Sequence, residues 1–230
     1  MGIAIAISGF ILALVIVSCG GGLTTEEVVK DIQGKASNIV TYKAAWMGVT
    51  YLKGQEVKAS GTVSFKRPRY MRITSVDSFG GELLMFFDGN NIWHYLPKEA
   101  IAYKYPQKEE DIYKAHLFGE GWGIPCWPFK GIEKDMKYLY SKTIKGEDLY
   151  VLEIITESQR PELATVSMPI RTQVFVRVKD GVIQKIISYD AQGKEIGFVE
   201  FKDVQINIAI PDSVFVFIPP KGVKVVEVME

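Results

Sequence analysis

The hydrophobic and polar positions follow three successive patterns along the chain. Residues 1–18 are almost uniformly apolar or glycine, with Ser8 and Ser18 as the polar positions. Residues 25–39 repeat apolar side chains at steps of three or four, the spacing of one helix face. From Tyr42 onwards apolar and polar residues alternate, which is typical of strands with one buried face. The pattern predicts one helix followed by a large antiparallel sheet.

The helix has a recognisable start. Thr24 with Glu27 three residues later forms a capping-box pattern. An apolar stripe follows at helical spacing, made of Val28, Ile32, Ala36 and Ile39. We therefore expect one amphipathic helix over about 25–39, packed on a sheet.

The alternating segments are separated by turn residues. Asp88-Gly89-Asn90-Asn91 is the strongest of these turn signals. The predicted strands are 43–51, 55–66, 70–76, 83–87, 92–96, 100–105, 142–145, 148–156, 172–178, 182–189 and 195–206, followed by a short extended end. A meander of about eleven strands twists strongly and tends to curl. The predicted fold class is therefore mainly β, with a helix across the open face.

The meander is interrupted between residues 106 and 142. Residues 108–118 have a helical pattern, and residues 119–129 combine Gly and Pro with Trp122 and Trp127. A loop with so many apolar residues is expected to pack over an apolar part of the protein. It is either a plug that closes one end of the core or a movable lid over a hydrophobic cavity.

The apolar start of the chain ends in a short motif. Ile16-Val17-Ser18-Cys19 matches the bacterial lipobox, in which the Cys sulfur receives a diacylglycerol and the residue becomes the new N-terminus. The run is short for a membrane span, which needs about 20 apolar residues, and has the length of a signal-peptide core. The alternative is an uncleaved membrane anchor.

These boundaries predict three parts of the chain. Residues 1–18 form a lipoprotein signal peptide, residues 19–24 the lipidated cysteine and a flexible leash, and residues 25–230 a single domain. The chains attached to Cys19, a diacylglycerol and an N-acyl chain, are covalent, and no other cofactor is expected. Two or more acyl chains give stable membrane anchoring.

The charge balance and the cysteine content argue against nucleic-acid binding and against a disulfide-stabilised fold. The chain has 27 basic and 27 acidic residues, so no overall field attracts nucleic acid. It has two cysteines, and lipidation of Cys19 leaves Cys126 alone, which excludes a disulfide framework.

Residues capable of catalysis are few. His94 should face solvent, on the strand face opposite Trp93 and Tyr95, and His116 has no metal ligand at a suitable spacing. Cys126 lies between Pro125 and Trp127, where a buried apolar role is expected. Nucleophile, metal and nucleotide motifs are absent from the sequence. We expect no enzymatic activity and no metal site.

Three stretches together resemble one protein family. Residues 61–68 (GTVSFKRP), 87–97 (FDGNNIWHYLP) and 215–223 (FVFIPPKGV) resemble strand, hairpin and C-terminal motifs of the lipoprotein localisation proteins LolA and LolB. They occur in the family order and bracket most of the mature chain. The resemblance implies an unclosed, eleven-stranded half-barrel whose cavity, under a helical lid, holds the acyl chains of lipoproteins crossing the periplasm.

The resemblance also implies roles for particular residues. In the soluble carrier the Arg of the KRP motif hydrogen-bonds the lid and gates the cavity, so Arg67 inherits that role, with Trp122 and Trp127 in the lid. Otherwise Arg67 only ends a strand beside Pro68. We expect Val63, Phe65, Trp93 and Tyr95 to line the cavity, with an ordinary filled core as the alternative.

The implied function is binding of acylated lipoproteins or phospholipid, and their sorting or transfer to the outer membrane. The protein would be anchored in the cell envelope, facing the periplasm, where a carrier or receptor protein could exchange cargo with it. The lipobox is shared with the anchored receptor, and the KRP motif with the carrier. Gly20 after Cys19 is compatible with outer-membrane sorting. The alternative is an anchored sensor or scaffold that binds a protein and carries no ligand.

Overall fold

The computed structural model describes residues 22–52, 54–108, 135–155 and 171–228. Within these ranges the chain forms one long α-helix near its start and one twelve-stranded sheet. The helix is α1 (Thr25–Ala36) and a 3-10 turn is η5 (Asp212–Phe215). The strands are β1 (Thr41–Leu52), β2 (Gln55–Lys66), β3 (Tyr70–Asp77), β4 (Glu82–Asp88), β5 (Asn91–Leu96), β6 (Ile101–Pro106), β7 (Met136–Ile144), β8 (Glu147–Ile155), β9 (Arg171–Arg177), β10 (Ile183–Tyr189), β11 (Glu195–Ile206) and β12 (Lys224–Glu227).

The sheet is an unclosed meander in two halves. The strand order is β12-β6-β5-β4-β3-β2-β1-β11-β10-β9-β8-β7, so β1 pairs with β11 at the centre and the first and last strands of that order do not meet. Each pair is antiparallel except β12 with β6, which is parallel. The predicted class, mainly β with an unclosed antiparallel sheet and an N-terminal helix, is confirmed.

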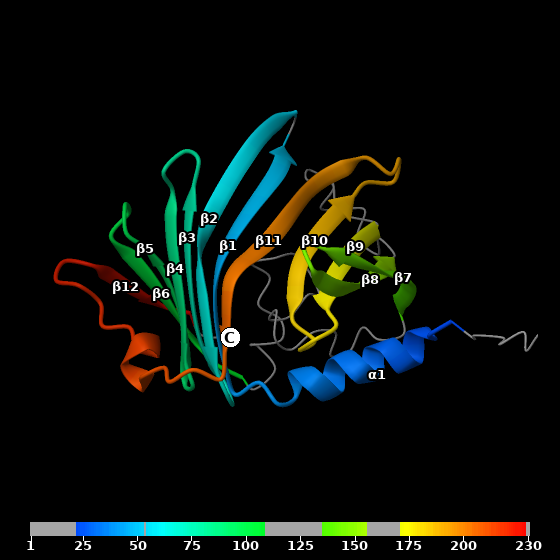
Figure 1. The fold of residues 1–230 in the computed structure, drawn as a ribbon. Coiled ribbons are helices and arrows are strands. Elements are labelled where there is room, and N and C mark those ends of the chain that lie inside the picture. Colours follow the sequence, from blue (N-terminus) through cyan, green and yellow to red (C-terminus); the bar gives the residue numbers. More distant parts are fainter. Residues whose placement is uncertain (1–21, 53, 109–134, 156–170, 229–230) are drawn as a thin grey trace, which may run out of the picture.

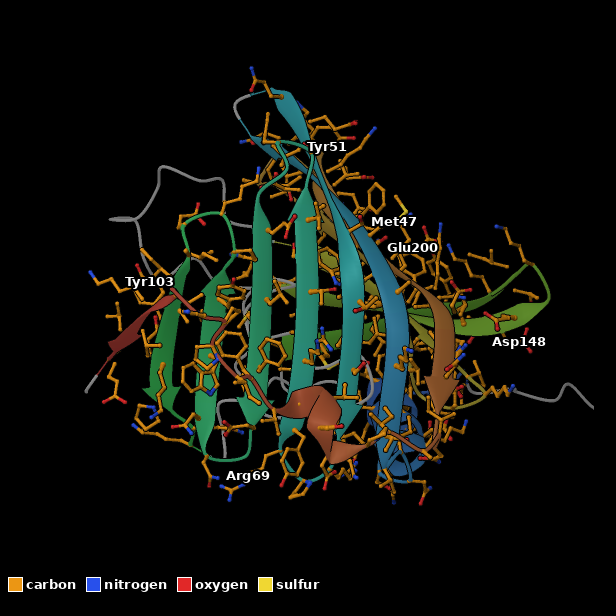
Figure 2. All side chains as sticks on the ribbon, turned by 90° about the vertical axis from the view of Figure 1, so that its left-hand side faces the viewer. Met47, Tyr51, Arg69, Tyr103, Asp148 and Glu200 are labelled. Atoms are coloured by element: carbon orange, nitrogen blue, oxygen red, sulfur yellow. The ribbon has the colours of Figure 1, made fainter. Side chains whose placement is uncertain are left out.

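Figure 1 shows a strongly curved sheet with α1 (blue) along the bottom, beneath β10 to β7. We call the face that carries the large core cluster shared with α1 the inner face, and the opposite one the outer face. The C-terminal strap, residues 211–223, lies across the outer face of β3 to β5, as Figures 1 and 2 both show. The helix α1 therefore packs on the inner face, and the C-terminal strap packs on the outer face.

The helix begins as predicted. The Thr24 hydroxyl accepts from the Glu27 backbone N–H, and the Glu27 carboxylate accepts from the Thr24 backbone, which completes the capping box. The bonds that the Glu27 carboxylate accepts from the Thr24 backbone N–H and from the Thr24 hydroxyl lower the pKa of Glu27 and favour its ionised form. The helix ends at Ala36 rather than at Ile39, because the Ser37 and Asn38 side chains cap the last turn on the Gly34 carbonyl. The residues of the apolar stripe are all buried.

Two strands differ from the prediction. β7 extends back to Met136, well before the predicted start at residue 142, because an irregularity between Tyr138 and Tyr140 breaks the alternation of its sequence. β12 is a twelfth strand, formed where only an extended end was expected. Pairing with a neighbouring strand, rather than local periodicity, therefore sets the start of β7 and the formation of β12.

Candidate functional site

The candidate site is the inner face of β2 to β6. Residues that pair directly across antiparallel strands share a face of the sheet, and two rows of such pairs cross this half. One row is Val63, Ile73, Met85, His94 and Tyr103, and the other is Phe65, Met71, Phe87, Ile92 and Tyr105. The members on β2, β3 and β4 are all apolar, and the polar members are His94 and the two tyrosines. The site is thus an apolar surface with a polar margin on β5 and β6.

The predicted lining residues Val63 and Phe65 lie on this inner face. Both are fully buried, at 0% exposure. Contact of a ligand with them remains a prediction. Met71 and Met85, which the sequence analysis did not single out, lie beside them in the same rows. Unbranched thioether side chains repack readily around ligands of different shape.

Trp93 and Tyr95 lie on the outer face, contrary to the prediction that they line the cavity. Trp93 pairs with Phe86, and both belong to a small outer-face cluster. The ring of Phe217 in the strap lies 5.0 Å from that of Phe86, 5.3 Å from that of Trp93 and 5.1 Å from that of Tyr95. The second and third family-like motifs therefore meet, and their aromatic side chains fasten the strap.

His94 takes the inner position that the prediction gave to its neighbours. Its partners across the sheet are Met85 and Tyr103, and its ring lies 5.1 Å from that of Tyr105. Burial lowers the pKa of His94, which favours the neutral imidazole. The expected exposure to solvent is wrong because alternation identifies two faces of a strand without saying which is inner.

Arg67 joins the end of β2 to the end of α1. Its Nε donates to the Ile39 carbonyl oxygen at 2.6 Å and its Nη2 to the Ala36 carbonyl oxygen at 3.2 Å. Its backbone N–H donates to the Val40 carbonyl oxygen. A cation beside the last carbonyls of a helix also interacts favourably with the helix dipole. Arg67 therefore does more than end a strand, and a gating role remains a prediction.

The helix is fastened to the other half of the sheet. The Tyr138 backbone N–H donates to Thr25 Oγ1 at 3.0 Å, and the Tyr150 hydroxyl donates to the Asp31 carboxylate at 3.1 Å. Burial, together with this bond to Asp31, raises the pKa of Tyr150 to about 12, so the hydroxyl stays protonated. These contacts place α1 on β7 and β8, and its C-terminal end reaches β2 through Arg67.

Gly61, the first residue of the KRP-containing motif, has a packing role that sequence reasoning missed. It pairs with Trp46, whose indole N–H crosses β2 and donates to the Thr74 carbonyl oxygen at 3.1 Å. A Cβ on Gly61 would lie 1.8 Å from that oxygen. Glycine in the middle of an alternating strand was the available signal, since it often marks a close backbone approach.

Several predicted residues lie outside the described ranges. These are the lipidation site Cys19 with its signal peptide, the lid residues Trp122 and Trp127, and also His116 and Cys126. Within the described ranges, no three His, Cys, Asp or Glu side chains are grouped closely enough to hold a metal ion. In the same part of the chain, no helix has the length and hydrophobicity to cross a membrane.

Comparison with known proteins finds a distant similarity in sequence. No family model matches the chain. An uncharacterized protein of Methanocaldococcus jannaschii is 24% identical over 215 residues, which are 93% of this chain and 57% of that protein. The chain thus spans little more than half the length of this relative.

Two solved structures illustrate the similarity of architecture. An uncharacterized conserved protein from Thermus thermophilus superposes with a TM-score of 0.59 at 11% identity, over 88% of this chain and 98% of that one. A LolA superfamily protein from Nitrosomonas europaea matches with a TM-score of 0.41 at 14% identity, over 85% of this chain and 98% of that one. The LolA superfamily is the family that three sequence motifs of this chain resemble.

Proposed function

We propose that this protein is an envelope lipoprotein, anchored through Cys19, that binds acyl chains of lipoproteins or phospholipids on the inner face of its sheet. It would take part in their sorting or transfer, with the outer membrane as destination. The role is binding, with no catalytic step. The observation that carries the proposal is the apolar inner face of β2 to β6.

The whole sheet is wide compared with the helix that accompanies it. Twelve strands at about 4.8 Å spacing span roughly 50 Å across the sheet. The twelve residues of α1 make a helix only about 18 Å long. The hydrogen bonds that fasten it fall on β7, β8, Val178 after β9 and the end of β2. Met85 and Phe87 are buried in the core cluster that includes residues of α1. An acyl chain gains about 25 cal/mol for each Å² of apolar surface withdrawn from water, so such a face suits lipid.

The charge of the inner face favours the apolar part of a lipid. The two rows from Val63 to Tyr103 and from Phe65 to Tyr105 contain no Asp, Glu, Lys or Arg. Burying a lone ion there would cost on the order of several kcal/mol. Acyl chains can enter while their charged head groups stay at the rim.

Native mass spectrometry tests the proposal. All contacts described above lie within residues 22–228, so residues 20–230, exported without Cys19 and purified without detergent, keep the whole sheet. We expect co-purified lipid, or uptake of added phospholipid or lipopeptide. Ile92→Asn, on the inner face, should reduce uptake several-fold because it places an amide in the apolar rows. Val76→Asn, at an exposed outer position, is the matched control.

The same experiment distinguishes acyl-chain binding from the alternative function, an anchored sensor or scaffold. A folded protein that takes up neither phospholipid nor lipopeptide would leave the anchored sensor or scaffold as the better description. Equal uptake by both variants would remove the inner face as the binding site. The anchor is tested separately, by the mass of the mature N-terminal peptide from the wild-type protein, which should carry the diacylglycerol and N-acyl chain on Cys19.

A further inference from the structure

A second surface of the protein, on the outer face of the other half of the sheet, is hollowed into a groove of about 540 Å³. Its floor is apolar and is formed by Leu149, Phe175 and Ile187, from β8, β9 and β10. Its rim includes Lys142, Lys145 and Lys185. We call this surface the outer groove. It lies on the opposite side of the sheet from the inner face.

Two of the rim lysines lie against aromatic rings rather than carboxylates. Lys142 Nζ is 4.4 Å from the centroid of the Phe175 ring, and Lys185 Nζ is 4.8 Å from that of the Phe198 ring. In the part of the chain that the structure describes, neither lysine forms an ion pair. Neither ammonium group is therefore held by a carboxylate, although Glu200 is the register partner of Lys185 on the next strand.

The acidic residues of the outer groove are already engaged. Glu147 accepts a hydrogen bond from Gln184 Nε2 at 2.6 Å and lies 3.8 Å from Arg177 Nη1. Glu200 lies 3.7 Å from Lys202 Nζ. The charge left over on the rim is therefore positive, although the chain as a whole is neutral.

The outer groove also lies near the point at which the chain leaves for its anchor. Thr25, the first residue of α1, accepts from the Tyr138 backbone N–H on β7. Lys142 lies four residues further along β7, or about 13 Å at 3.3 Å per residue. The five residues from Gly20 to Thr24 span at most about 18 Å when extended. A membrane that holds Cys19 is thus within reach of this half of the sheet.

We propose that the outer groove is a membrane-docking surface that binds anionic phospholipid head groups, with Lys142 and Lys185 as the residues that meet the phosphates. This inference rests on the proposed lipid anchor, since the anchor sets which half of the sheet lies near the bilayer. Docking here does not use the inner face of β2 to β6, the proposed acyl-binding surface.

Vesicle co-sedimentation of residues 20–230 tests the docking surface without the anchor. The vesicles are phosphatidylcholine alone, or phosphatidylcholine with about a third phosphatidylglycerol. We expect binding to the anionic vesicles that weakens at high salt, because surface charges are screened. The double variant K142A/K185A should bind about 30-fold more weakly, given the usual contribution of a lysine near an anionic surface.

The control is the double variant K58A/K104A, which removes the same charge from the other half of the sheet, at two lysines already paired with Glu56 and Glu227. It should bind the anionic vesicles like the wild type. Equal loss in both double variants, or no preference for anionic vesicles, would overturn the docking surface. Acyl-chain uptake is measured on the same samples. Normal uptake without vesicle binding refutes only the docking surface, and vesicle binding without uptake refutes only the acyl-binding function.

Discussion

The guanidinium of Arg67 donates a 2.6 Å hydrogen bond to the carbonyl oxygen of Ile39, which ties the last residue of the α1 apolar stripe to the turn after β2. Because its Nη2 also reaches the Ala36 carbonyl oxygen, one side chain serves two acceptors at the end of the helix. A single ammonium cannot reproduce this planar geometry. Arg67 is therefore the side chain through which α1 and the β2 half of the sheet are coupled.

Arg67→Lys should destabilise the protein by about 1.5–3 kcal/mol, the usual range for hydrogen bonds that involve a charged group. Urea unfolding measures the change, and hydrogen exchange should show faster opening of α1. The matched control is Arg69→Lys in the same turn, because within the described residues the Arg69 side chain makes no hydrogen bond or ion pair. Figure 2 shows Arg69 at the lower edge of the sheet. Equal effects of the two substitutions would contradict the coupling.

Gly61→Ala should destabilise the sheet by about 1–3 kcal/mol or more, the range typical of overpacking. The added Cβ would meet the Thr74 carbonyl oxygen at 1.8 Å and displace the Trp46 indole. Thermal unfolding and near-ultraviolet circular dichroism follow the two effects. Gly34→Ala in α1 is the control and should stabilise the protein slightly. Nothing lies within 4 Å of a Cβ added there, and alanine favours the helix more than glycine does. A neutral Gly61→Ala would show that β2 and β3 can separate at no cost.

Phe217→Ala should weaken the attachment of the C-terminal strap. The substitution removes ring contacts with Phe86, Trp93 and Tyr95, and about 2–4 kcal/mol of stability is expected to be lost. The neighbouring Ile218 is 79% exposed, so Ile218→Ala should change stability little. Urea unfolding compares the two variants, and limited proteolysis detects release of the strap. If Ile218→Ala proved the more damaging, the described packing of the strap would be wrong.

Brominated acyl chains, which quench tryptophan fluorescence on contact, should distinguish the two faces. Trp46 lies on the inner face and Trp93 on the outer face. In variants that keep only one tryptophan, with Phe at the other three positions, bound brominated lipid should quench Trp46 more strongly than Trp93. Stronger quenching of Trp93 would place the lipid on the outer face and remove the inner face as its site.

Stability should fall as the pH is lowered through the range in which His94 titrates. Burial lowers the pKa of His94 below its ordinary value of 6.5, so the unfolded chain binds a proton before the folded one does. Unfolding is therefore favoured as the pH falls below about 6.5, by at most about 1.4 kcal/mol per pH unit for one proton. His94→Gln should remove this part of the pH dependence.

The measurement is the urea midpoint at pH 7.5 and pH 5, for wild type and His94→Gln. His116 is present in both proteins, so its contribution cancels in the comparison. The difference in stability between the two should shift in favour of His94→Gln at pH 5. A difference that is independent of pH would show that His94 titrates alike in the folded and unfolded states.

The sequence predicts the elements well where short-range rules operate. The capping box at Thr24 and the turn at Asp88 satisfy backbone groups locally, so their geometry follows from a few neighbouring residues. Which face of β5 is the inner one does not follow from neighbouring residues, because Trp93 and His94 alternate whichever side is buried. On the outer face Trp93 packs against Phe217, which lies more than a hundred residues away in the sequence. Local alternation contains no information about that contact.

Other site features depend equally on distant partners. The partner of Arg67 is the end of α1, almost thirty residues earlier, and only the folded chain shows it. The lysines of the outer groove come from β7 and β10, and the rings beside them from β9 and β11, which are separate strands along the chain. A family-like motif indicated that Arg67 matters, whereas nothing in the linear pattern indicated the groove.

The pairing of β1 with β11 has a consequence for how the molecule is made. Met47 and Glu200 are register partners at the centre of the sheet, labelled side by side in Figure 2. Apart from β12, which pairs with the distant β6, each half can form from neighbouring hairpins. The seam needs strands roughly 150 residues apart, and such distant pairings form slowly. A nascent chain therefore shows β1 as an open edge until almost all of it has been synthesised. Until then β1 can pair with β2 but not with β11, so the two halves of the sheet remain separate.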